Sequence, residues 1–414
     1  MIVTSSAAWD LGISFCIDDE VFGQEIINEL KESLGSNVFI SMADDPHDSM
    51  EVAIGKGLRL NLQSDRLPGI LLENAMNELA SNKGKVALSC MTITSCFIDL
   101  FALGIAYIQL DTRFSPGQDP HAIEEVLVAL DNVMMKQAAE YLRETGVKVI
   151  TTLSKYNWID NITLRFDLAT TDKGYIFPGF SDVFYPEEGD NIKQLETYIK
   201  EYNSQTLGIV NTDDGVLYFG WAISAFIPTA DAEYSKIICV LKYSQIFNEV
   251  CIGYEKLFTR KLKDGLKSKL LKDKKNSLDF LDLQRLRTLA SAIDGITCFP
   301  SVTEDEDNLS IFRAFDRIAN IDARHKRIRE ASEVFHFIEM EILREKEELR
   351  QKQLNTIIFF LTALTFITVF ADILTTVDYS NSILPGHWSR FFLLISIPVL
   401  GILLIWTRFI RRNK

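Results

Sequence analysis

The stretch TIIFFLTALTFITVFADILTTV, from Thr356 to Val377, decides the architecture of this chain. It contains one charged residue, Asp372, and as a helix rising about 1.5 Å per residue it would be about 33 Å long. The hydrocarbon core of a bilayer is about 30 Å thick. A second apolar stretch, FFLLISIPVLGILLIWTRFI from Phe391 to Ile410, follows Trp388 and contains Trp406, as interfacial aromatics do. The sequence therefore predicts two transmembrane helices, at 356–377 and 388–410; a buried helical hairpin of a soluble protein is the alternative.

Basic residues predict the orientation of the two spans. The connector at 378–387, DYSNSILPGH, has no Lys or Arg, whereas both outer flanks are basic. Cytoplasmic flanks are enriched in Lys and Arg, so both termini are expected in the cytoplasm and the connector outside. We therefore expect a multi-pass protein of the cell or inner membrane. The basic residues are Arg344, Arg350 and Lys352 before the first span, and Arg408, Arg411, Arg412 and Lys414 after the second.

Composition narrows the class of protein further. A chain of 414 residues is longer than one compact core usually organises, so more than one folding unit is expected. The net charge of −14 argues against nucleic acid as a partner, because a phosphate backbone calls for basic patches. The 6 cysteines are scattered, which indicates reduced thiols in a cytoplasmic compartment. The N-terminus MIVTSSAAWDLG has no basic region followed by an apolar run, so no cleavable signal peptide is expected.

Short β-rich runs alternate with helical patterns over the first 230 residues, which is typical of an α/β or α+β layer structure. The apolar run Cys96–Leu110 is too short for a membrane span and carries Asp99, so we interpret it as a core strand or helix. The expected strands are Gly12–Ile17, Val38–Met42, Leu58–Leu62, Val86–Thr92, Ile105–Leu110, Val147–Leu153 and Ile162–Leu168. The expected helices are Phe22–Leu34, Leu67–Ala80, His121–Thr145 and Asn191–Tyr202.

The β character fades after residue 230. Helical patterns cover Asp231–Lys263 and Asn276–Ile296, and from Leu309 onward the pattern stays helical to the membrane without Pro or Gly. Apolar residues then recur at heptad spacing, which predicts a coiled-coil-like stripe and an oligomer of stalk helices. An amphipathic helix packed on its own domain is the alternative. The stripe consists of Ile328, Ala331, Phe335, Ile338, Ile342 and Leu349.

These boundaries give the predicted domain organisation. A cytoplasmic α/β domain is followed by a helical region, a long stalk helix and two transmembrane helices. The ranges are 1–230 for the α/β domain, 231–302 for the helical subdomain, 303–355 for the stalk helix, 356–377 for the first span, 378–387 for the outside loop, 388–410 for the second span and 411–414 for a basic cytoplasmic tail.

The first span has a partly polar face when it is projected at 100° per residue. An Asp within a bilayer costs about 3 kcal/mol unless it faces water or a partner, so Asp372 is a functional candidate. In a symmetric oligomer it would form a ring of carboxylates, an arrangement that selects cations. The alternative is that Asp372 reaches headgroup water. The predicted pore-lining residues are Asn355, Thr362, Thr365, Asp372 and Thr376.

Two acidic clusters are candidates for metal binding. The run Glu304, Asp305, Glu306 and Asp307 could hold hydrated cations between subunits, or it could be a solvated helix start capped by Thr303 or Asp305. The cluster at 44–48, DDPHD, has ligand types that suit divalent ions, but it equally fits a solvated turn. No phosphate-binding loop, nucleophile elbow or zinc-protease motif is present, so we expect no enzyme and name no catalytic residue.

The C-terminal third resembles the CorA family of divalent-cation channels. The family's Asn six residues before a Leu-Thr pair is matched by Asn355 with Leu361-Thr362. The loop LPGHW at 384–388 is similar to the family's Met-Pro-Glu-Leu-His-Trp stretch, and the tail at 411–414 is similarly basic. The resemblance implies a cytoplasmic α/β domain, a stalk helix entering the first span, and five copies around a pore that passes Mg²⁺ or a similar divalent cation.

The chain departs from the family at its hallmark tripeptide. Gly-Met-Asn falls, by ungapped count, on Tyr379, Ser380 and Asn381, so only the Asn is kept. In the family that tripeptide forms the outer mouth where hydrated magnesium is first recognised. Asp372 falls where the family more often has an uncharged polar pore residue, which suggests altered selectivity.

Two functions are therefore expected in competition. The first is a CorA-like homo-oligomeric channel for divalent cations, gated from its cytoplasmic domain. The second is a ligand-gated membrane effector on the same scaffold, for example a CRISPR-associated antiviral defence protein triggered by a nucleotide second messenger, as CorA-like proteins beside such systems suggest. A nucleotide pocket in the N-terminal domain would favour the second; the sequence identifies no ligand-binding residues.

Overall fold

The computed structural model describes residues 1–11, 20–35, 39–42, 57–63, 66–101, 103–153, 155, 179–203, 207–229, 232, 234–271, 280–296, 305–379, 396 and 399–401. The chain forms two compact units, Met1–Phe335 and His336–Lys414. The first unit is a mixed-sheet domain followed by helices, which confirms the expected layer structure at this level.

The sheet of the first unit has nine strands in the order β2-β3-β4-β5-β1-β6-β9-β8-β7. Among the described strands every neighbouring pair is antiparallel except β6 and β9. The first strand of the chain therefore lies in the interior of the sheet, between β5 and β6. The strands are β1 (Ile2–Asp10), β2 (Phe39–Met42), β3 (Gly57–Asn61), β4 (Met91–Phe101), β5 (Ile105–Phe114), β6 (Ser181–Tyr185), β7 (Gly208–Thr212), β8 (Gly215–Phe219) and β9 (Ile223–Pro228).

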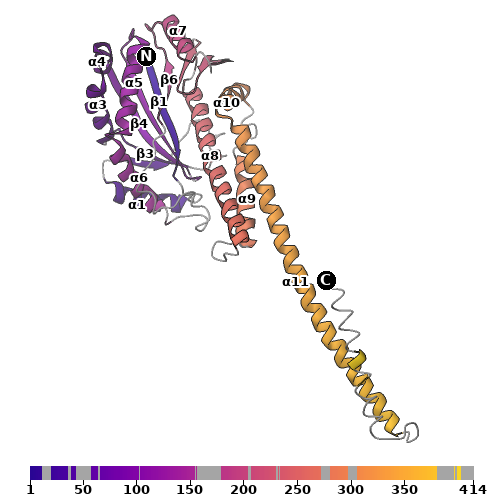
Figure 1. Ribbon diagram of the computed structural model, residues 1–414. Helices are drawn as coiled ribbons and strands as arrows, with labels where there is room; N and C mark the ends of the chain where they lie inside the picture. Colours follow the sequence, from indigo (N-terminus) through magenta and orange to yellow (C-terminus); the bar gives the residue numbers. More distant parts are fainter. Residues whose placement is uncertain are drawn as a thin grey trace. The chain divides into compact units, whose positions relative to one another are not determined.

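One face of the sheet carries the main hydrophobic core. Side chains alternate along a strand, so Val3, Ala7 and Trp9 of β1 lie on this face with Ile108 and Leu110 of β5. Burying an aliphatic side chain contributes about 1.5–3 kcal/mol, which makes this face the main source of stability. Figure 1 shows the covering helices packed against it. They are α1 (Glu20–Leu34), α3 (Arg66–Glu78), α4 (Asn82–Ser89), α5 (Pro120–Met135) and α6 (Ala139–Leu153).

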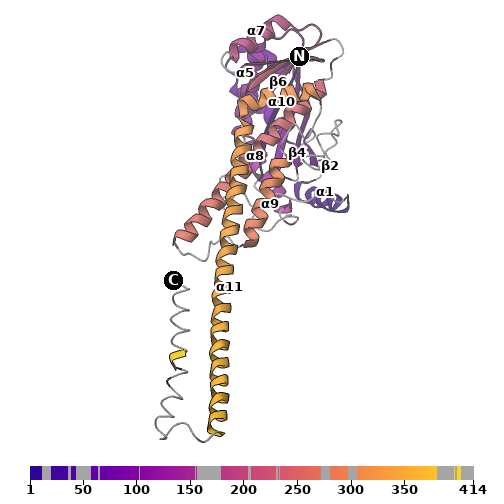
Figure 2. The same cartoon turned by 90° about the vertical axis from the view of Figure 1, so that its right-hand side faces the viewer.

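The opposite face of the sheet is polar although it is also covered. Directly paired antiparallel residues point to the same side, so Thr4 lies beside Asp111 and Ser6 beside Gln109. Helix α8 (Tyr234–Leu271) crosses β1 and β5 on this face, and α10 (Glu306–Ala319) packs on β7 and β8 (Figure 2). Buried polar groups need partners, so a polar sheet face beneath a helix points to a functional site.

Two of the expected strands are wrong. Residues 86–92 fall mainly in α4, where the Ser81 hydroxyl caps the helix by accepting from the Gly84 N–H at 2.9 Å. Residues 147–153 belong to α6, which buries Leu142, Val149 and Leu153 on one side against α1. The β-branched residues of VKVITTL favour a strand locally, but burial of an amphipathic helix face outweighs propensity.

Other expectations are confirmed in part. The expected helix His121–Thr145 is two helices, α5 and α6, with a break at 136–138. The expected strands at 12–17 and 162–168 lie outside the described residues, as does the acidic cluster at 44–48. Confirmed within a few residues are the strands at 38–42, 58–62 and 105–110, the helices at 22–34, 67–80 and 191–202, and α9 (Phe280–Ile296). The expected helix Asp231–Lys263 is confirmed as α8, but it continues to Leu271.

The helix expected to run unbroken from Leu309 to the membrane is interrupted at Asn320. This residue adopts the left-handed conformation, with φ 57° and ψ 45°, and ends α10. Asn tolerates that conformation better than other residues with a side chain. A new helix, α11 (Ile321–Tyr379), begins at the next residue. The Asp316 carboxylate stabilises the corner by accepting from the Asp322 N–H at 3.0 Å.

The first part of the heptad stripe packs on its own domain, which is the alternative raised for it. Ile328 and Phe335 are fully buried, and the Phe335 ring lies edge-on to Phe258 of α8, with centroids 5.8 Å apart. Ion pairs reinforce this packing, because Glu255 of α8 binds Arg324 and Arg327 of α11. These residues are therefore used within one chain; the stalk and its oligomer stay predictions.

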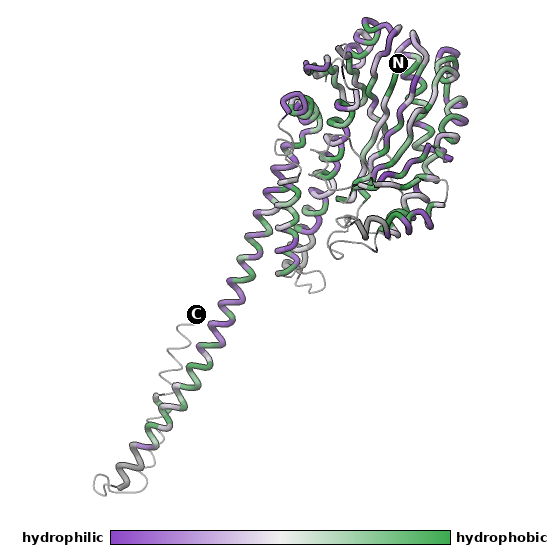
Figure 3. Tube along the Cα trace, turned by 180° about the vertical axis from the view of Figure 1, so that it is seen from behind, coloured by the Kyte–Doolittle hydropathy of each residue, from purple (hydrophilic) through white to green (hydrophobic). Residues whose placement is uncertain are grey.

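In the second unit, α11 becomes apolar towards its C-terminal end, as Figure 3 shows. Within the described residues, the stretch Ile321–Asp372 is long and apolar enough to cross a membrane, and only 11% of its most apolar window is buried. A core helix of a soluble protein would be mostly buried, so this one could span a bilayer. Phe359 and Ala363 are the buried residues of its described apolar part, and Phe366 lies against Gly401. The second expected span otherwise lies outside the described residues.

The corner at Asn320 gives a first prediction. Replacing Asn320→Val should lower the free energy of unfolding by about 1–2 kcal/mol, because a β-branched residue is strained at positive φ. Asn320→Gly should be neutral or slightly stabilising, since glycine adopts this conformation freely. Denaturant unfolding of the purified protein measures both. Arg313→Val, at an exposed position of α10, is the matched control and should lower the free energy of unfolding by only about 0.4 kcal/mol. Equal losses in Asn320→Val and Asn320→Gly would contradict the interpretation.

Candidate functional site

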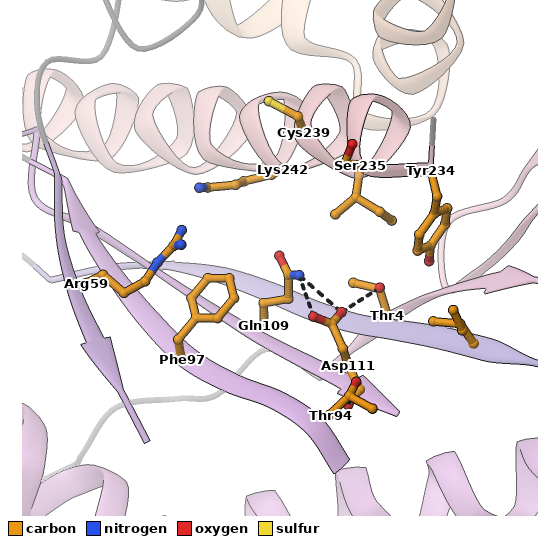
Figure 4. A pocket seen from close by; sticks show the side chains of 12 residues that line it. Thr4, Arg59, Thr94, Phe97, Gln109, Asp111, Tyr234, Ser235, Cys239 and Lys242 are labelled. Carbon is orange, nitrogen blue, oxygen red and sulfur yellow. Dashed lines mark hydrogen bonds between the residues drawn. The ribbon is translucent and has the colours of Figure 1, made fainter. Parts of the chain in front are cut away.

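A cavity of about 400 Å³ lies between α8 and the polar face of the sheet (Figure 4). Strands β1, β3, β4 and β5 form its floor, and the first turns of α8 form its roof. Its lining combines charged, amide, hydroxyl and aromatic side chains. The lining residues are Ile2, Thr4, Arg59, Thr94, Phe97, Gln109, Asp111, Tyr234, Ser235, Ile238, Cys239 and Lys242.

A β-bulge in β4 shapes one wall of this cavity. The pairing of β4 with β5 shifts between Ile93 and Ser95, so Thr94 is the extra residue. The Thr94 hydroxyl donates to the Asp111 carbonyl at 3.1 Å, and the Ser95 hydroxyl donates to the Asp111 carboxylate at 2.5 Å. The bulge thus directs two consecutive hydroxyls at one residue of β5. Bulges recur next to functional sites because they re-aim side chains in this way.

The Asp111 carboxylate is held by hydrogen bonds on both oxygens. Thr4 Oγ1 donates to Oδ1 at 2.6 Å, and Gln109 Nε2 lies 3.1 and 3.0 Å from Oδ1 and Oδ2. Because these donors come from β1, β4 and β5, they fix the carboxylate across three strands. With its amide nitrogen committed to Asp111, Gln109 presents its carbonyl oxygen towards the cavity (Figure 4). That oxygen can accept from a bound molecule.

A charged cluster forms the other end of the cavity. Asp99 is fully buried and receives Arg59 through two hydrogen bonds, Nε–Oδ1 at 2.7 Å and Nη2–Oδ2 at 2.8 Å. Lys242 Nζ, on α8, lies 2.8 Å from the same Oδ2. Two cationic side chains, Arg59 and Lys242, thus lie together at this end of the cavity. A ligand anion would be favoured there.

Aromatic rings complete the lining. The Arg59 guanidinium lies 4.0 Å from the centroid of the Phe97 ring, and this stacking holds it in place. At the opposite end, the Tyr234 hydroxyl donates to the Val183 carbonyl at 3.0 Å, and burial raises the pKa of this phenol. The arrangement suits a molecule of modest size with an anionic group near Arg59 and Lys242 and a flat or polar part towards Gln109.

The predicted pore residues lie on an exposed part of α11. Thr362 and Thr365 donate their hydroxyls to the Ile358 and Leu361 carbonyls at 2.7 and 2.9 Å, which satisfies them within the helix. Asn355 and Asp372 are exposed as well. The buried residues Phe359 and Ala363 lie on another face at 100° per residue. The backbone of Thr376 and Tyr379 is described as helix, whereas their side chains, like Ser380 and Asn381, lie outside the description.

The acidic run has structural partners in the first unit. Asp305 caps α10 by accepting from the N–H groups of Asp307 and Asn308, and it pairs with Lys236 Nζ at 3.0 Å. Burial raises the Asp305 pKa, but these hydrogen bonds and Lys236 outweigh it, so the pKa is lowered. Asp307 accepts from the Asp213 N–H at 2.8 Å. Capping by Asp305 is thus confirmed; Glu306 lies beside it, Glu304 lies outside the description, and metal binding stays a prediction.

The cavity residues were not identified from the sequence as a site, although a signal was present. Asp99 lies in the apolar run CFIDLFALG, and Lys242 lies in the apolar helix segment IICVLKYSQIF. A charge inside a buried apolar run needs an opposite charge elsewhere in the fold. The two are separated by 143 positions in sequence, so only the tertiary structure pairs them.

The charged cluster gives a second prediction. Asp99→Asn should destabilise the fold by about 3–5 kcal/mol, because it leaves the buried Lys242 and the partly buried Arg59 facing an uncharged amide. Adding Lys242→Met to Asp99→Asn should recover part of that loss, since one buried charge is removed. Chemical denaturation of both variants in detergent measures this coupling. A double variant no more stable than Asp99→Asn alone would contradict the assigned pairing.

Comparison of the chain with protein-family models, with curated proteins and with solved structures found no match, so the resemblance to CorA-like channels rests on the residues quoted above.

Proposed function

We propose that this protein is a CorA-like membrane channel for divalent cations that is opened by a small anionic ligand bound beneath α8. The observation that carries the proposal is the cavity between α8 and the sheet, whose lining includes charged, amide and hydroxyl side chains; a purely structural domain would fill this space with apolar side chains. Its Arg and Lys side chains and its fixed acceptor groups are those of a ligand site. The proposed protein is a homo-oligomer, a pentamer by the resemblance, with two spans and both termini in the cytoplasm.

Helix α8 supplies the connection from the cavity to α11. It lines the cavity with Lys242, and about 20 Å further along the same helix Glu255 binds Arg324 and Arg327 of α11. A ligand that binds more tightly when α8 lies in one position than in another shifts the equilibrium towards the first position. The first turns of α11 contact α8, and α11 continues as a single helix to Tyr379. A shift of α8 can therefore be transmitted along α11 to its apolar segment.

The pore part of the proposal is supported by the exposed polar residues of α11. Thr362, Thr365 and Asp372 are exposed in the single chain, so neighbouring copies can bring them together around an axis. A ring of Asp372 carboxylates would attract Mg²⁺ or a similar cation, while Asn355 would line the cytoplasmic end. Tyr379, Ser380 and Asn381 would form the outer mouth.

A second candidate is the ligand-gated defence effector triggered by a nucleotide messenger. The specific observation that favours it is the combination of Arg59 and Lys242 with the Phe97 and Tyr234 rings in one cavity. Phosphate groups pair with Arg and Lys, and bases stack on aromatic rings, so a nucleotide matches this combination. The two candidates share the scaffold and opening by an anionic ligand, and they differ in whether that ligand has to be a nucleotide messenger.

Magnesium uptake into liposomes gives a third prediction. Asp372→Asn should lower the uptake reported by an enclosed magnesium-sensitive dye by about tenfold, because the charged ring is lost. Thr368→Val is the matched control, since Thr368 is a threonine of the same helix that lies off the predicted polar face, and its uptake should be unchanged. Uptake unaffected by Asp372→Asn would remove Asp372 from the permeation path. A wild type that is silent until a nucleotide is added would favour the second candidate.

The cavity gives a fourth prediction. Gln109→Leu should abolish the response of uptake to a panel of mononucleotides and cyclic dinucleotides, because the acceptor that faces the cavity is replaced by an apolar group. Gln194→Leu, an exposed glutamine of α7 (Ile192–Tyr202), is the control and should respond like the wild type. Calorimetric titration of the same nucleotides into both variants separates lost binding from lost conduction. An intact response in Gln109→Leu would place the ligand elsewhere.

A further inference from the structure

A second cavity, of about 290 Å³, lies further along α8, beside β1 and β6. It is lined by parts of the chain that are distant in sequence, from α5, the loop before β6, the loop between β8 and β9, α8 and α10. None of its described residues lines the first cavity. They are Ser6, Ala7, Ala8, Asp131, Gly179, Phe180, Ser181, Trp221, Ala222, Gln245, Asn248, Glu249 and Phe315.

The lining holds a buried acceptor that lacks a donor. Asn248 is only 5% exposed, yet its Oδ1 has no hydrogen-bond partner among the residues that the structure describes. Its Nδ2 donates to Glu249 Oε1 in a long hydrogen bond of 3.4 Å. An unpaired buried carbonyl costs about 1–3 kcal/mol, so an N–H donor entering the cavity would remove a penalty that the fold otherwise carries.

The charge of the lining has one sign. Asp131 and Glu249 are its ionisable side chains, and the described lining contains no basic residue. Burial and Asp10 raise the pKa of Glu249 to about 7, against the opposite effects of Lys256 and Arg324. Burial likewise raises the pKa of Asp131, although the Phe180 N–H donates to its Oδ1 at 3.1 Å. A bound cation would stabilise both carboxylates in their charged form.

Aromatic rings form the remaining wall. Trp221 is 53% exposed, which is high for a tryptophan, and its ring centroid lies 6.2 Å from that of Phe315. Phe180 also lines the cavity. Aromatic faces attract organic cations, and their apolar surface suits the hydrocarbon part of a ligand. A bare metal ion does not match this wall, and no group of three or more acidic, His or Cys residues that could hold one exists among the described residues.

We propose that this second cavity binds a primary organic amine. Its ammonium group donates to the orphan Oδ1 of Asn248 and pairs with the carboxylates of Glu249 and Asp131, while its carbon chain lies against Trp221 and Phe315. The proposal is independent of the ligand proposed for the first cavity, because the two sites share no lining residue and take ligands of opposite charge.

Calorimetric titration of the full-length protein in detergent tests this site with butylammonium chloride as the probe. The uncharged isostere butanol serves as the matched ligand and should bind at least tenfold more weakly. Asn248→Leu should weaken butylammonium binding at least tenfold without lowering the melting temperature, since it replaces an unpaired amide by an apolar group of similar size. Trp221→Ala should weaken binding about fivefold. Ile209→Ala, at an exposed position of β7, is the control and should bind like the wild type.

Two results would overturn the proposal. One is butanol binding as tightly as butylammonium, which would make the cavity an apolar site only. The other is unchanged butylammonium affinity in Asn248→Leu, which would place the amine elsewhere. The affinity should also rise between pH 6 and pH 8 as Glu249 loses its proton, and a flat pH profile would remove Glu249 from the site.

Discussion

The Asp99 carboxylate is fully buried between the sheet and α8, and its charge has to be compensated inside the fold. Arg59 from β3 and Lys242 from α8 supply that compensation. The interaction therefore determines where α8 can lie, since moving the helix along the sheet would leave buried charges unpaired. The rest of the first unit depends on this placement, because α8 in turn supports α10 and the first turns of α11.

The two faces of the sheet have different roles: one carries the hydrophobic core, and the other carries the polar groups of the candidate site. One face packs alternating aliphatic and aromatic side chains against helices and needs no specific partner beyond complementary shape. The other face carries hydroxyl, amide and carboxylate groups, each of which needs a partner in the poorly solvated layer beneath α8. Such a polar layer is costly to build and is expected where a molecule is bound. Both cavities open along this same helix, one near Lys242 and the other near Asn248.

The apolar part of α11 obeys a different constraint. Inside a bilayer every backbone and hydroxyl group must find its partner within the protein, and a continuous helix satisfies this requirement. The hydroxyls of Thr362, Thr365 and Thr368 donate to carbonyls one turn earlier. A carboxylate at this depth is costly unless it faces water or a partner, so the surroundings of Asp372 in the assembled protein matter most for the proposed conduction.

The long apolar helix and the sheet-and-helix class of the first unit could be predicted from the sequence, as could Asp305 as one of two candidate caps of α10, because hydrophobic length, periodicity and caps are local properties. The sequence did not predict β1, whose run SSAA has low strand propensity and becomes a strand only between β5 and β6. Nor did it separate helix from strand in VKVITTL, where packing on α1 decides. The candidate site could not be predicted from the sequence either, because it too depends on tertiary packing. Asp99 and Lys242 are 143 positions apart, and what pairs them is the position of a helix on a sheet.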